Sequence, residues 1–214
     1  FTEGVANGSM TLYKEEAVNI VATQGDMTTP VITGYDYRLA VDIGHAAASY
    51  FAVTGETGTM TAGESQTITV KLYDQFNNIA TTYNGDKELT FSGAAISELG
   101  NAPSVAMTEF GDPTTLNFTN GMASGTMFLF KAEDAAIKVS NGSQDTSDDF
   151  AWEVTVSPNI AHNLAITTEP AHNTTEAIAG VPFSTQPVIR IRDVYGNLLV
   201  SDDTTEITAA TGDT

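Results

Sequence analysis

The chain has 214 residues, enough for one or two ordinary domains, and 41% of them are hydrophobic, so a real core can form. With 27 acidic and 8 basic residues, the formal net charge is −19, which argues against binding to nucleic acid or to an anionic membrane surface. The absence of cysteine excludes disulfides and thiolate chemistry. No apolar run approaches about 18 residues, so no membrane insertion is predicted in this segment. The chain begins at Phe1 without a signal peptide, and we expect it to be part of a longer protein.

Alternating apolar residues predict strands in the first part of the chain. The alternation runs over residues 5–12 and again over 18–22, and a turn is expected between them at 15–17. Gly25-Asp26 is typical of another turn. Residues 35–42 alternate once more, which predicts that the following side chains point inward: Tyr35, Tyr37, Leu39 and Val41.

A junction at 43–45 leads into a second series of elements. The predicted strands are 50–54, 66–73, 89–91 and 152–156, and turns are expected at 61–65 and 74–78. Residues 93–116 are predicted to form a long connection punctuated by Gly and Pro, with Val105 and Met107 in a short strand. Residues 145–149 are expected to form an acidic loop, and a third series begins at Asn163.

The stretch from Phe118 to Ile137 repeats the opening of the chain. The offset is constant, because 118 − 1 and 131 − 14 both equal 117. Farther on, residues 164–167 match 51–54 at an offset of 164 − 51 = 113, and 193–197 match 74–78 at 193 − 74 = 119. A repeat of this size is that of a domain, and the drift in offset indicates loop insertions.

The repeat divides the chain into three units. Residues 1–44 are the C-terminal half of one unit, 45–161 a complete unit, and 162–214 the N-terminal half of a following unit. Roughly seven short strands per unit, turn signals every 8–12 residues and no helical pattern are typical of immunoglobulin folds. The predicted fold is therefore all-β: tandem immunoglobulin-like (Ig-like) β-sandwiches, one whole and two partial.

Residues 163–170 and 179–197 resemble the tandem Ig-like repeats of large bacterial and archaeal cell-surface proteins of adhesin, surface-layer or sheath and filament type. The stretch 118–137 resembles the later strands of such repeats, where a Phe-x-x-Gly strand leads into an x-Leu-Phe/Tyr-Lys-Ala-Glu segment. The central unit departs from the pattern, because Asn77 replaces the usual Gly and Thr-Gln-Pro is absent around 65–67. The resemblance implies an extracellular, cell-surface location.

Two groups of oxygen-bearing residues are candidate Ca²⁺ ligands. The turn Asp-x-aromatic-Gly/Asn-Asn occurs at 74–78 and 193–197, where the alternative interpretation is an Asx turn with an inward-facing aromatic ring. An acidic cluster near the second junction is the other candidate. The candidate ligands are Asp145, Asp148, Asp149, Asp74, Asp193 and Asn197. No other cofactor is predicted.

Four Asn-x-Ser/Thr sequences are candidate glycosylation sites, which would make the protein a glycoprotein if its host has that pathway. They are Asn7, Asn117, Asn141 and Asn173. Chance is the competing explanation, because Asn, Ser and Thr are abundant. Asn141 is the best placed, since Asn141-Gly142 is typical of an exposed hairpin turn.

The sequence shows no nucleophile elbow, P-loop or zinc motif. The adjacent carboxylates at 15–16 and 202–203 lie on expected turns, whereas paired-carboxylate glycosidases need such groups facing each other across a cleft. His45 and His162 occupy equivalent junction positions, which suits a linker hydrogen bond better than a metal ligand or a pH-sensitive hinge. No enzyme activity is therefore predicted.

Two functions remain open. The first is a structural segment of a surface layer, sheath, filament or stalk, whose partial units are completed by adjacent repeats of the same chain or by other copies of it. The second is an adhesin module that binds a surface glycan or a protein through loops, with or without Ca²⁺. Residues 93–116 are the candidate loop, and Phe110 and Phe118 are the aromatic residues near it.

Overall fold

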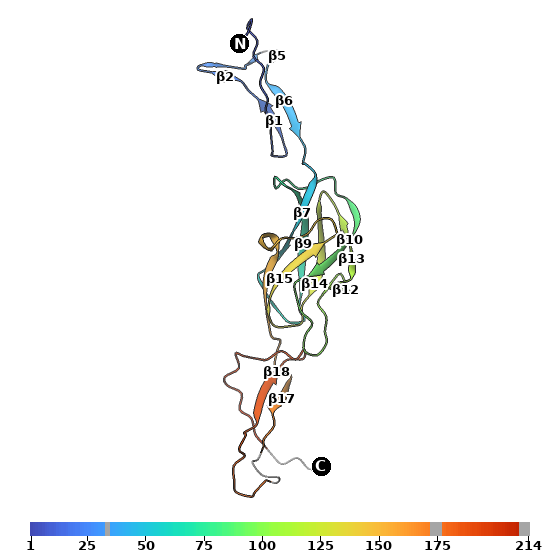
Figure 1. The fold of residues 1–214 in the computed structure, drawn as a ribbon, viewed down its shortest axis with the longest axis vertical. Coiled ribbons are helices and arrows are strands. Elements are labelled where there is room, and N and C mark those ends of the chain that lie inside the picture. The colour runs from blue at the N-terminus through green and yellow to red at the C-terminus, as the bar shows by residue number, and fades with distance from the viewer. Residues whose placement is uncertain (33–34, 172–176, 210–214) are drawn as a thin grey trace.

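The computed structural model describes residues 1–32, 35–171 and 177–209. Three bodies follow one another along the long axis of the molecule (Figure 1). A complete sandwich lies in the middle, and a smaller set of strands lies on each side of it.

The middle body is a sandwich of two five-stranded sheets, which confirms the predicted Ig-like fold. One sheet has the order β13 (Pro113–Phe118), β10 (Gly85–Ser92), β15 (Asp134–Ser140), β16 (Trp152–Ser157) and β8 (Thr59–Thr61). The other has the order β12 (Thr108–Glu109), β11 (Ser104–Val105), β14 (Met122–Phe128), β9 (Ser65–Asp74) and β7 (Ala48–Gly55). Neighbouring strands are antiparallel except β16 and β8. A short 3-10 helix, η1 (Asp148–Phe150), precedes β16.

Alternation along the strands fills the space between the two sheets. On β9, Ile68, Val70 and Leu72 are fully buried, and the residues between them are more exposed. Phe51 on β7 and Phe118 on β13 approach each other in the core, with ring centroids 6.3 Å apart. The core is thus formed between the early strands of the unit and the late ones, and it needs both sets of strands.

The flanking bodies are much smaller. On the N-terminal side, β1 (Glu16–Ile20) pairs with β6 (Leu39–Ile43), and two short pairs lie beside them: β2 (Thr23–Gln24) with β3 (Met27–Thr28), and β4 (Val31–Ile32) with β5 (Tyr35–Asp36). On the C-terminal side, β17 (Asn163–Thr168) pairs with β18 (Val188–Arg192). Each flanking body contains strands equivalent to only part of the central sandwich.

The strand predicted over residues 5–12 is wrong, because this stretch contains only an isolated bridge between Thr2 and Val5. Its equivalent in the central unit is β14, which is paired on both sides, with β9 and with β11. The described residues include no counterpart of β9 or β11 beside residues 5–12, so this stretch has no strand to pair with. The turn predicted at 15–17 is also wrong, since Glu16 and Ala17 belong to β1 and pair with β6.

The inward orientation predicted for residues 35–41 is wrong for most of them. Tyr35, Tyr37 and Leu39 are 66%, 58% and 61% exposed, and the strand is interrupted between β5 and β6. The pairing register also differs from that of the complete unit. Val18 pairs with Val41, whereas the equivalent central pair, β15 with β16, would place Val18 opposite residue 37, a shift of 41 − 37 = 4. A shift by an even number of residues leaves each side chain on the same face of the sheet. Register is strongly specified only where one face is buried, so without a second sheet over this pair its register is weakly specified.

The segment predicted as one long connection, 93–116, contains three strands, β11, β12 and the start of β13. Val105 is buried in β11 as expected, but Met107 lies in the following turn with φ +69° and an exposed fraction of 87%. The strand β13 was missed, although its alternation of exposed and buried residues runs through Thr114, Leu116 and Phe118. Pro113 at its start, read as loop punctuation, is compatible with the first residue of a strand.

Phe51 and its repeat equivalent Leu164 provide a matched test of which residues form the core. Phe51 is fully buried, whereas Leu164 is 51% exposed. We expect Phe51→Ala to lower the unfolding free energy of the central unit by about 3–5 kcal/mol, and Leu164→Ala to lower it by less than about 1 kcal/mol. Denaturant unfolding followed by the fluorescence of Trp152, the single tryptophan, measures both. Equal losses would contradict the assignment of the core.

Candidate functional site at the joints between units

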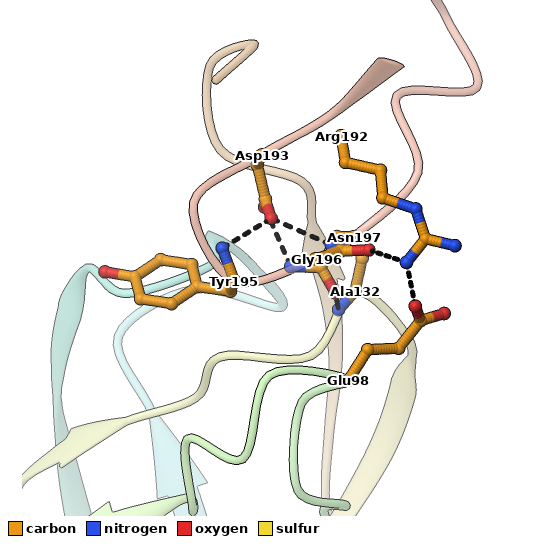
Figure 2. Close-up of polar contacts among 7 residues, drawn as sticks. All are labelled: Glu98, Ala132, Arg192, Asp193, Tyr195, Gly196 and Asn197. Atoms are coloured by element: carbon orange, nitrogen blue, oxygen red, sulfur yellow. Dashed lines mark hydrogen bonds and ion pairs between the residues drawn. The ribbon is translucent and has the colours of Figure 1, made fainter. Parts of the chain in front are cut away.

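A turn that begins with Asp193 forms the joint between the central unit and the C-terminal one (Figure 2). The Asp193 side chain is fully buried. Its Oδ1 accepts hydrogen bonds from the backbone N–H groups of Tyr195 and Asn197, each at 2.8 Å. Its Oδ2 accepts from the backbone N–H of Asn159 and from the Asn197 side-chain amide, again at 2.8 Å. Asn159 lies in the linker before β17, so one carboxylate shapes the turn and holds the linker.

The Asn197 side chain extends the joint into the preceding unit. Its Nδ2 donates to the backbone carbonyl of Phe130 at 2.8 Å, and its Oδ1 accepts from the backbone N–H of Ala132 at 2.8 Å. The side chain is 6% exposed, so both bonds are shielded from water. Asn197 therefore joins two units through backbone groups, and the contact does not depend on which side chains the preceding unit carries there.

Side chains around these bonds close the joint. The ring of Tyr195 packs against Phe130 with centroids 5.1 Å apart, and lies where a Cβ on Gly63 would overlap it. Asn159 donates from its side chain to the carbonyl of Ala62 at 2.7 Å. An ion pair between Arg192 and Glu98 also crosses the joint, but such half-exposed pairs contribute little. The hydrogen bonds to buried groups therefore dominate.

The first joint repeats the arrangement around Asp74. Asp74 is fully buried, and its Oδ1 accepts from the backbone N–H groups of Phe76 at 2.8 Å and Asn78 at 2.9 Å. Its Oδ2 accepts from the backbone N–H of Ala46 at 2.7 Å and from the Asn78 side-chain amide at 2.9 Å. Ala46 lies in the linker before β7, as Asn159 lies in the linker before β17.

Asn78 reaches the N-terminal unit as Asn197 reaches the central one. Its Nδ2 donates to the carbonyl of Tyr13 at 2.7 Å, and its Oδ1 accepts from the backbone N–H of Glu15 at 2.8 Å. Tyr13 and Glu15 are the repeat equivalents of Phe130 and Ala132, since 130 − 13 and 132 − 15 both equal 117. The two joints are therefore the same structure built twice.

Hydrogen bonds keep the buried carboxylates charged. Burial raises the pKa of Asp74, but the bonds from Asn78, Ala46 and Phe76 outweigh it and lower the pKa from 3.8 to about 2. The pKa of Asp193 is lowered too, because burial is outweighed by the bonds from Asn197, Asn159 and Tyr195. Both side chains are thus ionised acceptors at neutral pH, which strengthens each bond.

The structure places the candidate Ca²⁺ ligands in different environments. The oxygens of Asp74, Asp193 and Asn197 face the N–H donors described above. Asp148 forms an ion pair with Lys138, and Asp145 and Asp149 are exposed. Within the described ranges, no group of three or more acidic or histidine side chains is arranged to hold a metal ion. Calcium binding therefore stays a prediction.

The aromatic ring of the turn does not point into its own sandwich, so that part of the Asx-turn interpretation is wrong. Phe76 is 40% exposed and packs against Tyr13 of the N-terminal unit, with ring centroids 4.7 Å apart. Tyr195 makes the equivalent contact with Phe130. The ring belongs to the joint because the left-handed residue that follows it, Asn77 at φ +67°, turns the chain back along the boundary between units.

The candidate glycosylation sites also differ. The Asn141 side-chain nitrogen donates to Tyr83 Oη at 3.3 Å and to Gln144 Oε1 at 2.9 Å, so it is already engaged. Asn117 is exposed on β13 and donates to Asp86 Oδ1 at 2.6 Å, and Asn7 is exposed. Asn173 lies outside the described residues. Glycosylation stays a prediction, and exposure favours Asn7 and Asn117 over Asn141.

The aromatic residues assigned to a sugar-binding loop do not form an exposed platform. Phe118 is 1% exposed in the core, and Phe110 packs against Phe91 with centroids 6.0 Å apart. The junction residue His45 has Nδ1 2.6 Å from the carbonyl oxygen of Ala46 and Nε2 3.0 Å from Thr82 Oγ1, as expected for a linker residue.

Sequence reasoning missed that the two recurring motifs of the repeat bind each other. The Asp-x-aromatic turn and the aromatic-Lys-x segment were each noted, but as separate features. The signal was available, because both motifs occur twice, at 74–78 with 13–15 and at 193–197 with 130–132. What the sequence lacks is any indication that the Asn side chain crosses the boundary.

Solved structures of bacterial surface proteins are similar to this chain. FdeC, an adhesin of Escherichia coli, is 17% identical over 84% of this chain and 52% of its own, with a TM-score of 0.42. InvD of Yersinia pseudotuberculosis is 13% identical over 76% of this chain and 47% of its own, with a TM-score of 0.44. Domains 1-6 of the surface layer protein SbsC are 15% identical over 76% of this chain and 18% of their own, with a TM-score of 0.33.

FdeC is an adhesin and SbsC a surface-layer protein, and these are classes that the sequence resembles. The chain spans about half the length of the FdeC and InvD chains. No protein-family model and no curated protein matches it. The Ig-like fold is established by the strand order and register described above. In the part of the chain that the structure describes, no helix is long and apolar enough to cross a membrane.

The charge on Asp74 can be tested by its isosteric amide. We expect Asp74→Asn to lower the unfolding free energy of the central unit by on the order of 2 kcal/mol at pH 7, because a charged acceptor for four hydrogen bonds is lost. Asp112→Asn, at an exposed loop position, serves as the control. Urea unfolding followed by tryptophan fluorescence gives both values.

The difference between wild type and Asp74→Asn should depend on pH. The pKa of Asp74 in the folded chain, about 2, lies below its ordinary value of 3.8. Its stabilisation is therefore fully present above about pH 4 and is lost as the pH falls through about 2. A difference that stays constant from pH 7 to pH 2 would show that the carboxylate is not the stabilising group.

Proposed function

We propose that the chain is a structural, non-catalytic segment of an extracellular surface assembly, such as a surface layer, sheath, filament or stalk. The observation that supports this most directly is the same hydrogen-bonded joint at two successive unit boundaries. A joint that recurs with the repeat fixes each unit relative to the next, which is what an extended assembly needs. The classes named in the resemblance agree with this role.

The joint resists bending because bending would break hydrogen bonds made by buried groups, among them the Asp193 carboxylate and the Asn197 side chain. Asp193 binds the linker through Asn159, and Asn197 binds the preceding unit through Phe130 and Ala132. An unmet buried group costs about 1–3 kcal/mol, and more when it is charged. A linker that makes no such bonds behaves as a flexible chain. The joint thus converts a string of domains into a stiff rod.

The charge of the chain suits the same role. A net charge of −19 keeps the molecule soluble, and like charges on neighbouring units repel, which favours an extended arrangement. Screening by salt weakens this repulsion beyond about 10 Å at 0.1 M, whereas the buried bonds of the joint are little affected. The stiffness should therefore persist at high ionic strength.

Small-angle X-ray scattering tests the stiffness. We expect the double variant Asn78→Ala/Asn197→Ala to show a broader distribution of dimensions and a lower radius of gyration than wild type, because both cross-unit amides are removed. Asn141→Ala is the matched control, since the side chain of Asn141 bonds to Tyr83, Ser143 and Gln144, all within the central unit. Identical profiles for all three proteins would contradict a structural role of the joints.

The location can be tested on the cells that produce the protein. An antibody raised against the 214-residue chain should label intact cells or material attached to them in immunogold electron microscopy. Cells without the gene provide the control for the antibody. Labelling that appears only after permeabilisation would overturn the extracellular assignment, whatever the scattering experiment shows.

A further inference from the structure

A polar cavity of about 360 Å³ lies beside the turn between β8 and β9, next to the end of β16. All of its lining residues belong to the complete central unit, so neither flanking unit takes part in it. Its walls carry hydroxyl groups, one amide and one carboxylate, and no basic side chain. The lining residues are Thr57, Thr59, Met60, Thr61, Glu64, Ser65, Gln66 and Ser157.

The Gln66 side chain brings an unpaired acceptor to this cavity. The side chain is 9% exposed, and its Nε2 donates to Thr57 Oγ1 and to the backbone carbonyl of Thr59, each at 2.7 Å. A carbonyl oxygen can only accept, so the amide nitrogen must face Thr59 and the orientation of the amide is fixed. The amide oxygen, Oε1, is buried and has no hydrogen-bond partner among the described residues. Because an unpaired buried acceptor destabilises a fold, Oε1 is expected to bind a group from outside the chain.

The other free groups of the lining are oxygen atoms as well. Glu64 takes part in none of the ion pairs formed by the described residues. Of the hydroxyls in the lining, only that of Thr57 forms a hydrogen bond within the described part of the chain. A carboxylate and an amide carbonyl can only accept, and a hydroxyl can accept through its lone pairs. The lining is therefore a set of oxygen ligands with one negative charge, which favours a cation.

A metal ion fits the buried amide oxygen better than water or an ammonium group does. Gln66 Oε1 has almost no surface accessible to water, and a hydrogen-bonded partner would lie about 2.7–3.2 Å from it. Ca²⁺ approaches oxygen to about 2.3–2.6 Å, accepts about six to eight ligands in flexible geometry, and combines carboxylates with neutral oxygens and water. Mg²⁺ requires a nearly ideal octahedron and keeps several of its waters. The burial and the mixed ligand set therefore favour Ca²⁺.

We propose that this cavity binds one Ca²⁺ ion, with Gln66 Oε1 and the Glu64 carboxylate as ligands and with hydroxyls of the lining and water completing the shell. The site is separate from the acidic residues at 145–149, none of which lines the cavity. With a single carboxylate, the dissociation constant is expected to be about 10⁻⁴–10⁻³ M, the range of extracellular modules. The net charge of −19 raises the concentration of cations near the surface.

The bound ion would also restrict the turn on which the second joint rests. Glu64 directly follows Ala62 and Gly63 in this turn. The carbonyl of Ala62 accepts from the side chain of Asn159 at 2.7 Å, and Gly63 lies against the ring of Tyr195. An ion that holds Glu64 would therefore reduce the motion of the turn. Binding at the cavity does not depend on the proposed structural function.

Isothermal titration of CaCl₂ into the 214-residue chain tests the site, with MgCl₂ as the comparison at constant ionic strength. We expect saturable binding of Ca²⁺ and at least tenfold weaker binding of Mg²⁺. Glu64→Gln should weaken the binding of Ca²⁺ at least tenfold, and because Glu64 is exposed, this variant should keep its fold. Glu56→Gln is the matched control, since Glu56 is also exposed and does not line the cavity.

Thermal unfolding followed by Trp152 fluorescence tests the role of Gln66. We expect about 20 mM CaCl₂ to raise the Tm of wild type by at least about 3 °C, because the ion binds only the folded chain. Gln66→Met, which lacks the amide oxygen, should show no such rise. Each variant is compared with itself before and after Ca²⁺ is added, so a lower starting Tm does not affect the result.

Three outcomes would overturn the inference. The first is the absence of saturable Ca²⁺ binding, which would leave the amide oxygen as an unpaired acceptor only. The second is equal affinity of Glu64→Gln and Glu56→Gln. The third is binding that is lost in Asp145→Asn/Asp149→Asn but kept in Glu64→Gln, which would place the ion in the acidic loop instead.

Discussion

The structure depends on a buried carboxylate at each boundary between units. Asp74 and Asp193 carry a full charge with no exposed surface, and each is stabilised only by N–H donors that come from its own turn and from the linker. Because the donors are mostly backbone groups, the turn, the linker and the neighbouring unit must adopt one geometry together. The buried charge is stable only when all these donors are in place, and this requirement fixes the position of each domain relative to the next.

The repeat keeps this geometry while its loops change. The linker donors Ala46 and Asn159 are separated by 159 − 46 = 113 residues, and the carboxylates by 193 − 74 = 119. The extra residues lie between β17 and β18, away from the joint. Insertions in a surface loop cost little free energy, whereas a displaced donor at the joint would leave a buried charge unmet. The joint is therefore the part of the repeat under the tightest physical constraint.

The flanking units show what a sandwich half does without its partner. Residues 5–12 form no strand although their equivalents form β14, and β1 and β6 pair four residues away from the central register. The local turn survives, since Glu3 and Gly4 have φ values of +52° and +80°, close to +50° and +75° at Asn120 and Gly121. Turns depend on neighbouring residues, whereas strands and registers depend on a second sheet that lies elsewhere in the fold.

The repeat, the all-β class and the alternating core of the central unit can be predicted from the sequence alone, because periodicity and turn residues are local properties of the chain. Both Asp-x-aromatic turns can be located in the same way. The role of these turns depends on long-range contacts, since the bonds between Asn78 and residues 13 and 15 join groups 78 − 13 = 65 and 78 − 15 = 63 positions apart. The exposure of Leu164 against the burial of Phe51 was likewise decided by which strands lie over them. The alternation of apolar residues predicts which face of a strand is apolar, but that face is buried only when other strands cover it.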